Sequence, residues 1–118
     1  MEAKKILVVD DIGINRLLPG MMLRPLGFEV HECSDGAMAL EYLKQQQMHV
    51  VLLDISMPVI SGMDVLRAIK AMPERPLVFA YTAYADPSGE YALQQQGFDA
   101  VLIKPLSFDA LLKKLGLF

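Results

Sequence analysis

The chain has 118 residues, of which 53% are hydrophobic and 21% charged, and its net charge at pH 7 is −3. This length suits a single compact domain, residues 1–118, with one hydrophobic core. The apolar runs do not approach the roughly 18 residues of a membrane span, and the slightly acidic balance argues against direct binding of nucleic acid. We therefore expect one domain, not attached to a membrane, whose partners are proteins or small anions.

The N-terminus and the cysteine content indicate a cytoplasmic location. Residues 1–5 lead directly into a short apolar segment and lack the long apolar region and the cleavage site of a secretory signal. The single cysteine, Cys33, allows no internal disulfide, and two histidines with one cysteine are too few for a zinc cluster. Cys33 is therefore predicted to be a small residue of the core.

The first part of the chain predicts two strands and two helices. Residues 6–9 are apolar and predict a short strand, and residues 28–33 alternate apolar and polar side chains, as a strand at a sheet edge does. Helices are predicted over residues 14–26 and 37–46. Pro19 should kink the first helix or shift its start, because proline lacks a backbone N–H and clashes with the preceding turn.

The stretch at residues 50–53 is the most informative part of the sequence. Four apolar residues without polar alternation indicate a strand buried on both faces, as in the centre of a parallel sheet. The strand ends at Asp54, and the carboxyl ends of parallel strands form the crevice where ligands bind. Asp54 is therefore the first functional candidate, although an aspartate that merely caps a turn is as common at such a position.

The second half of the chain continues the alternation of helices and strands. Ser61 with Asp64 is close to a capping box at the start of a helix. Two further apolar runs predict strands, at residues 76–81 and 100–103. Residues 86–89 are predicted as a loop before a short helix, and Ser107 as the cap of a last one. Five strands alternating with five helices predict an α/β fold with a parallel sheet and helices on both of its faces.

Polar side chains follow four of the predicted strands at one edge of the sheet. They are Asp10 and Asp11, Asp54, Thr82, and Lys104. Three carboxylates within ~4 Å would repel one another by several kcal/mol at an effective dielectric constant of about 20, so the cluster needs a cation. Mg²⁺ fits best, because it prefers oxygen ligands and is usually held by one or two carboxylates with a phosphoryl group. A metal beside a carboxylate, a hydroxyl and a lysine indicates a phosphoryl site with the carboxylate as nucleophile.

Four motifs carry a family resemblance over the whole chain. They are V-V-D-D at 8–11, L-D-I-S-M-P at 53–58 with Gly62, Tyr81-Thr82-Ala83, and Lys104-Pro105. The chain resembles the receiver domain of bacterial two-component response regulators. The resemblance implies a doubly wound, flavodoxin-like fold with five strands in the order 2-1-3-4-5.

The resemblance also implies a role for each site residue. By position these are Asp54 as phosphoacceptor and metal ligand, Asp10 and Asp11 as metal-binding acids, Ser56 as a metal ligand through its backbone carbonyl, Thr82 as switch hydroxyl, and Lys104 as the phosphate-contacting lysine. A cis bond before Pro105 is implied as well. Val101 stands where the family usually carries a tyrosine or phenylalanine that turns inward, and we expect the valine to weaken the switch.

As a member of this family, the domain would accept a phosphoryl group on Asp54, with Mg²⁺, from a histidine kinase or a histidine phosphotransfer protein. The change of conformation would control a partner or an attached output domain. Such a domain is not an enzyme, since it catalyses only its own phosphorylation and dephosphorylation. It would be a stand-alone receiver or a piece of a regulator or hybrid kinase.

Two other functions remain open at this point. A magnesium-dependent phosphohydrolase would also use Asp54 as nucleophile, but such enzymes typically place a second acid two residues later, where this chain has Ser56. A receiver-like module could bind partners without phosphorylation, and the complete set of site residues argues against that alternative.

Overall fold

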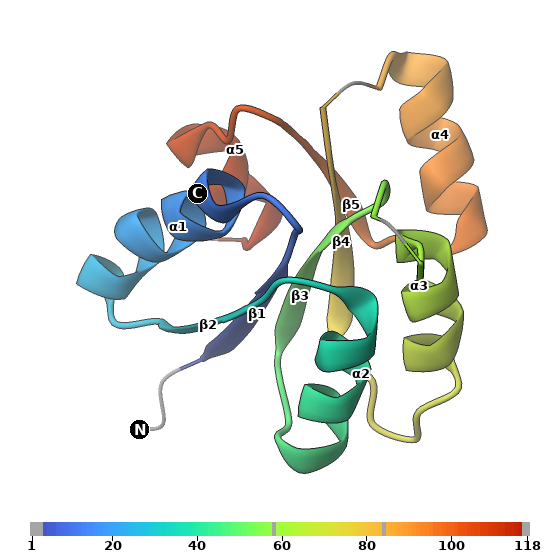
Figure 1. Ribbon diagram of the computed structural model, residues 1–118. Coiled ribbons are helices and arrows are strands. Elements are labelled where there is room, and N and C mark those ends of the chain that lie inside the picture. Colours follow the sequence, from blue (N-terminus) through green and yellow to red (C-terminus); the bar gives the residue numbers. More distant parts are fainter. Residues whose placement is uncertain (1–3, 58, 84, 117–118) are drawn as a thin grey trace.

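The computed structural model describes residues 4–57, 59–83 and 85–116 (Figure 1). Five parallel strands form one sheet in the order β2-β1-β3-β4-β5. The strands are β1 (Lys5–Val9), β2 (Glu29–Cys33), β3 (Val50–Asp54), β4 (Leu77–Thr82) and β5 (Ala100–Ile103). The predicted fold class and strand order are confirmed.

The helices cover both faces of the sheet. They are α1 (Gly13–Leu23), followed by the short 3-10 helix η1 (Arg24–Leu26), then α2 (Gly36–Gln45), α3 (Gly62–Lys70), α4 (Pro87–Gln96) and α5 (Phe108–Lys114). In Figure 1, α1 and α5 lie on one side of the sheet, and α2, α3 and α4 on the other. Two hydrophobic clusters, one on each side, fill the space between the sheet and these helices.

The central strands supply both hydrophobic clusters. Along β3, Val51 and Leu53 belong to the cluster beneath α2 and α3, while Val50 and Leu52 belong to the cluster beneath α1 and α5. All of these side chains are buried, which explains why the strand has no polar alternation. The edge strand β2 does alternate, with two of its five residues exposed. Cys33 is buried in the core, as predicted.

The first helix differs in detail from its prediction over residues 14–26. Pro19 lies inside α1 without ending it, and the α-helix stops at Leu23. The last turn is the 3-10 helix η1, which contains Pro25. Because Pro25 has no N–H to donate, the ladder of α-helical hydrogen bonds cannot continue through it.

The prediction of a loop over residues 86–89 was wrong. Helix α4 begins there, with Asp86 as the N-cap and Pro87 in the first turn. The Asp86 carboxylate accepts a hydrogen bond from the backbone N–H of Gly89 at 2.7 Å. Proline, serine and glycine indicate a loop by composition, but proline is well tolerated in a first helical turn, where its missing N–H would have no partner. The sequence signal was that of a helix start.

Two smaller predictions can be compared with the structure. Ser61 and Asp64 form the capping box of α3, and the peptide bond between Lys104 and Pro105 is cis. None of the helices in the described ranges is both long enough and apolar enough to cross a membrane.

Candidate functional site

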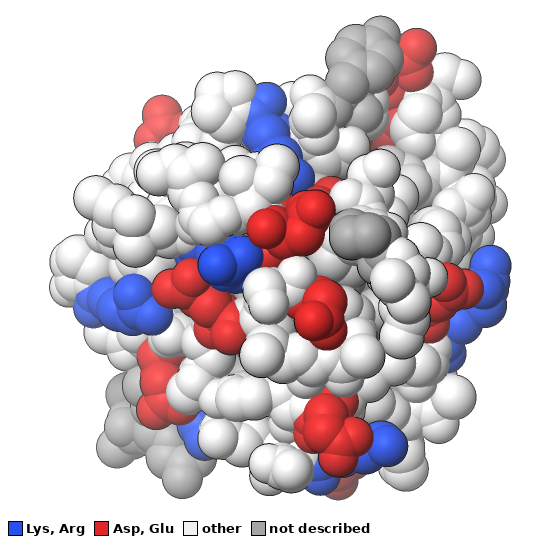
Figure 2. Space-filling model, viewed as in Figure 1, with Lys and Arg blue, Asp and Glu red and all other residues white. Residues whose placement is uncertain are grey.

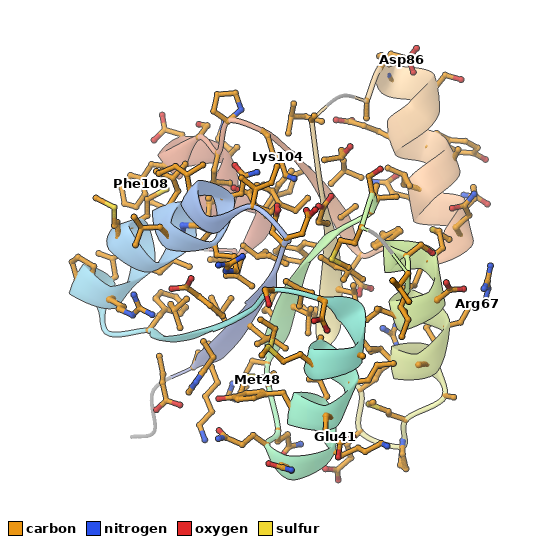
Figure 3. All side chains as sticks on the ribbon, viewed as in Figure 1. Glu41, Met48, Arg67, Asp86, Lys104 and Phe108 are labelled. Carbon is orange, nitrogen blue, oxygen red and sulfur yellow. The ribbon has the colours of Figure 1, made fainter. Side chains whose placement is uncertain are left out.

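The predicted site residues meet at the carboxyl edge of the sheet. Asp10 and Asp11 follow β1, Asp54 ends β3, Thr82 ends β4, and Lys104 follows β5. Lys104 is labelled at this edge in Figure 3, and Figure 2 shows acidic side chains beside basic ones near the centre of the same view. The parallel topology brings together residues that are up to 94 positions apart in the sequence, the difference between 104 and 10.

Three carboxylates form the acidic part of the site. One oxygen from each of Asp10, Asp11 and Asp54 lies within 4.8 Å of the other two. Asp10 is fully buried, Asp54 is 4% exposed, and Asp11 is exposed. Backbone amides orient the two buried side chains: Ile12 N–H donates to Asp10 Oδ1 at 2.9 Å, and Ser56 N–H donates to Asp54 Oδ1 at 3.1 Å. Both amides bond to Oδ1, so neither of these two hydrogen bonds uses the Oδ2 atom of Asp10 or Asp54.

Lys104 supplies the positive charge of the site. Its Nζ lies 2.7 Å from Asp10 Oδ2 and 3.4 Å from Asp54 Oδ1. Asp10 Oδ2 is buried and has no hydrogen bond of acceptable geometry from any residue that the structure describes, so the ammonium balances its charge without a directed bond. A single ammonium faces three carboxylates, and this imbalance leaves room for a second cation.

The donor set fits Mg²⁺. Carboxylate oxygens are hard ligands, and Mg²⁺ is commonly held by one or two of them, keeping several waters. Asp10 offers a buried oxygen without a directed donor, and Asp11 offers an exposed carboxylate on the solvent side. Because histidine and cysteine are absent from this cluster, its chemistry does not suit zinc.

The environment raises the pKa of Asp54 above its ordinary value. Burial is the largest cause, because it disfavours the charged carboxylate; the hydrogen bond from the Ser56 amide acts in the opposite direction. The negative charge of Asp10 raises the pKa further, and Lys104 lowers it. A divalent cation at the site would favour the ionised and nucleophilic form of Asp54.

Gly62 keeps the end of β3 in place. A Cβ atom at this position would lie 2.4 Å from the backbone oxygen of Asp54 and 2.6 Å from Cα of Ile55. Gly62 N–H also donates to the Ile55 carbonyl at 3.0 Å. The glycine of the L-D-I-S-M-P motif therefore allows the start of α3 to pack directly against the backbone that carries Asp54.

The other predicted residues lie around this centre. Lys104 N–H donates to the carbonyl of Thr82 at 2.7 Å, so the threonine and the lysine leave neighbouring strands side by side. Ser56 is exposed, two residues beyond Asp54. Val101 is 5% exposed and pairs in register with Ala80 of β4, within the cluster on the α2 and α3 side.

The sequence analysis assigned no role to two residues that touch the site. Arg16 Nη1 donates to the backbone carbonyl of Asp10 at 2.8 Å and ties α1 to the end of β1. The ring of Tyr81 lies 5.0 Å from Lys104 Nζ, and burial, followed by the charges of Asp10 and Asp54, raises the pKa of Tyr81 to about 12. One signal in the sequence could have pointed to Tyr81. It lies in a strand predicted to be buried, and a buried tyrosine hydroxyl usually needs a hydrogen-bond partner.

The chain belongs to the response regulator receiver domain family, whose model matches residues 6–116. The CAI-1 autoinducer sensor kinase/phosphatase CqsS of Vibrio cholerae is 31% identical over 117 residues, which cover 96% of this chain and 17% of that protein. This chain therefore spans less than a fifth of that relative's length.

Solved receiver domains have the same fold. The receiver domain of the sensor histidine kinase PA1611 from Pseudomonas aeruginosa, with a magnesium ion coordinated in its active-site cleft, is 30% identical with a TM-score of 0.84, covering 96% of this chain and 94% of that chain. The receiver domain of Ssk1 from Saccharomyces cerevisiae, crystallised with the phosphotransfer protein Ypd1, is 25% identical with a TM-score of 0.82, covering 96% and 86%. The predicted family is confirmed, and with it the class of function, a phosphoacceptor domain of two-component signalling.

Proposed function

We propose that Asp54 is the phosphoacceptor of this receiver domain, and that residues 1–118 act as one unit in a cytoplasmic phosphorelay. The donor would be the phosphohistidine of a histidine kinase or a phosphotransfer protein. The observation that carries the proposal is the meeting of Asp10, Asp11, Asp54 and Lys104 at one edge of the sheet, with an oxygen of each carboxylate within 4.8 Å of the others.

Each residue of the site would have its own role in the transfer of the phosphoryl group. A carboxylate oxygen of Asp54 attacks phosphorus, the P–N bond to the donor imidazole breaks, and its electron pair stays on the imidazole nitrogen. Mg²⁺, held by Asp10, Asp11, Asp54 and the Ser56 carbonyl, would neutralise charge on the transferring group. Lys104 Nζ lies 2.7 Å from Asp10 Oδ2. From this position, 3.4 Å from Asp54 Oδ1, the ammonium would contact one phosphoryl oxygen, and the Thr82 hydroxyl would contact another.

We also propose a partner and a cofactor for this chain, and a place for it in a larger signalling protein. The crystallised pair of Ssk1 and Ypd1 supports a phosphotransfer partner for this chain, and the magnesium ion of the PA1611 receiver domain supports Mg²⁺ as the cofactor. Because relatives such as CqsS are much longer sensor kinases, we propose that the chain works as a receiver within or beside a sensor kinase. In either case it would catalyse only its own phosphorylation and dephosphorylation.

One experiment separates this function from its alternatives. The protein is incubated with Mg²⁺ and acetyl phosphate, and its intact mass is followed over time with the release of inorganic phosphate. A single, slowly lost phosphate adduct that Asp54→Asn abolishes supports the receiver. Continuous release of phosphate without an adduct would support a phosphohydrolase, and neither adduct nor release would support a module that binds without phosphorylation.

A further inference from the structure

A tyrosine of β4 donates a hydrogen bond to α1 at the point where Pro19 interrupts the hydrogen bonds of the helix. Tyr81 is fully buried, and its hydroxyl donates to the carbonyl of Asn15 at 3.2 Å. In an α-helix the N–H of residue 19 would donate to that same carbonyl, but Pro19 has no N–H. The Tyr81 hydroxyl therefore replaces the hydrogen bond that the proline removes.

The ring of the same tyrosine lies against the functional lysine. Lys104 Nζ is 5.0 Å from the ring centroid, within the range of a cation–π contact. The same ammonium is 2.7 Å from Asp10 Oδ2 and 3.4 Å from Asp54 Oδ1. Tyr81 thus connects two parts of the molecule, the middle of α1 and the charged group beside the nucleophile.

We propose that Tyr81 is a positioning residue for phosphoryl transfer, which holds the Lys104 ammonium beside Asp54 and is itself fixed to α1 through the Asn15 carbonyl. The inference rests on the proposed function, in which Lys104 contacts the phosphoryl group. A lysine side chain has a flexible four-carbon stem, and a ring that restricts it removes part of the ordering cost before the reaction. Pro19 gives the hydroxyl its acceptor.

A matched pair of substitutions tests the contact with Lys104. Tyr81→Leu and Phe79→Leu both remove a buried aromatic ring from β4 in the same cluster, but it is the ring of Tyr81 that lies 5.0 Å from Lys104 Nζ. Phosphorylation by acetyl phosphate is measured at saturating Mg²⁺, at a temperature where urea unfolding shows every variant to be folded. We expect the maximal rate to fall about tenfold in Tyr81→Leu, within the range of a partly desolvated cation–π contact, and less than about twofold in Phe79→Leu. Equal rates in the two variants would overturn the proposal.

A spectroscopic measurement tests the same contact without phosphorylation. The ring current of Tyr81 should shift the ε-methylene proton resonances of Lys104 upfield. This shift should persist in Tyr81→Phe, which keeps the ring, and disappear in Tyr81→Leu. If the shift is present but the wild type takes up no phosphate, the proposed function fails. If the shift is absent in the wild type, the positioning role fails whatever the activity.

The link to α1 is tested by a double-mutant cycle. Tyr81→Phe leaves the Asn15 carbonyl without its donor, so the unfolding equilibrium should shift about tenfold toward the unfolded state in the Pro19 protein. Pro19→Ala supplies a helical N–H to that carbonyl, so in this background Tyr81→Phe should shift the equilibrium less than about threefold. Equal shifts in the two backgrounds would show that the hydroxyl does not replace the missing helical bond.

Discussion

Replacing Lys104 by methionine should make the domain depend on Mg²⁺ for its stability. The substitution keeps much of the apolar stem and removes the charge that lies 2.7 Å from Asp10 Oδ2. Asp10 is fully buried, and removing one partner of a buried ion pair typically costs about 3–5 kcal/mol. Because the Lys104 side chain is 13% exposed, water can reach part of the site. We therefore expect a loss of about 3 kcal/mol in the free energy of unfolding without metal.

The same substitution should strengthen the binding of Mg²⁺. Two unit charges 4 Å apart interact by about 4 kcal/mol at an effective dielectric constant of 20, so an ammonium and a divalent ion at that distance would repel each other by about 8 kcal/mol. Since the Lys104 side chain is partly exposed and water screens the repulsion, we expect about a sixth of this, or roughly tenfold tighter binding. At a concentration 100 times the Kd, the ion would then add about 2.7 kcal/mol and restore most of the lost stability.

Urea unfolding with and without saturating Mg²⁺, together with calorimetric titration of the ion, measures both effects. Lys44→Met is the control, since Lys44 forms an exposed pair with Glu41 at 3.6 Å, and such a pair is worth no more than about 1 kcal/mol. The reasoning would be refuted if Lys104→Met cost no more stability than Lys44→Met, or if its affinity for Mg²⁺ were unchanged.

Three further substitutions or ligands test other parts of the structure. Gly62→Ala should lower the free energy of unfolding by about 2 kcal/mol and slow phosphorylation, because its Cβ would lie 2.4 Å from the Asp54 carbonyl; unchanged urea unfolding would contradict this. Hydrogen bonds from Ser61 lower the pKa of Asp64, so the stability they contribute is present above pH about 4 and is lost as the pH falls through the folded-state pKa. Asp64→Asn should therefore flatten stability against pH in this range, and an unaltered profile would exclude the assignment. Beryllofluoride should perturb amide NMR shifts strongly around Asp54 and weakly at Val101, whereas equally large shifts at Val101 would show that the switch works without an aromatic residue.

Most of the fold and the site's centre could be predicted because they depend on short-range patterns. The apolar run at 50–53 indicated a central strand, and parallel strands necessarily deliver Asp10, Asp54 and Lys104 to a common edge. Placing these residues at one edge required no knowledge of which distant segments of the chain contact one another. A polar residue directly after each strand is enough to place the site.

What escaped prediction depends on contacts between distant segments or on competing local signals. The hydrogen bond from Tyr81 to Asn15 joins residues 66 positions apart. The sequence shows a tyrosine in a buried strand and a proline in a helix, but it does not indicate that the two lie close together. At residues 86–89 the same composition suits a loop and a helix start. The Asp86 cap decided between them, because its carboxylate accepts the N–H of Gly89.

The assignment of Asp54 is tested most directly by locating the phosphoryl group. The protein is phosphorylated with acetyl phosphate and Mg²⁺ and then treated with sodium borohydride, which reduces an aspartyl phosphate to homoserine. Peptide mass spectrometry then locates the reduced residue. We predict homoserine at position 54 alone, and none when Mg²⁺ is replaced by a chelator. Homoserine at Asp10 or Asp11, or equal labelling of Asp54 without the metal, would contradict the account.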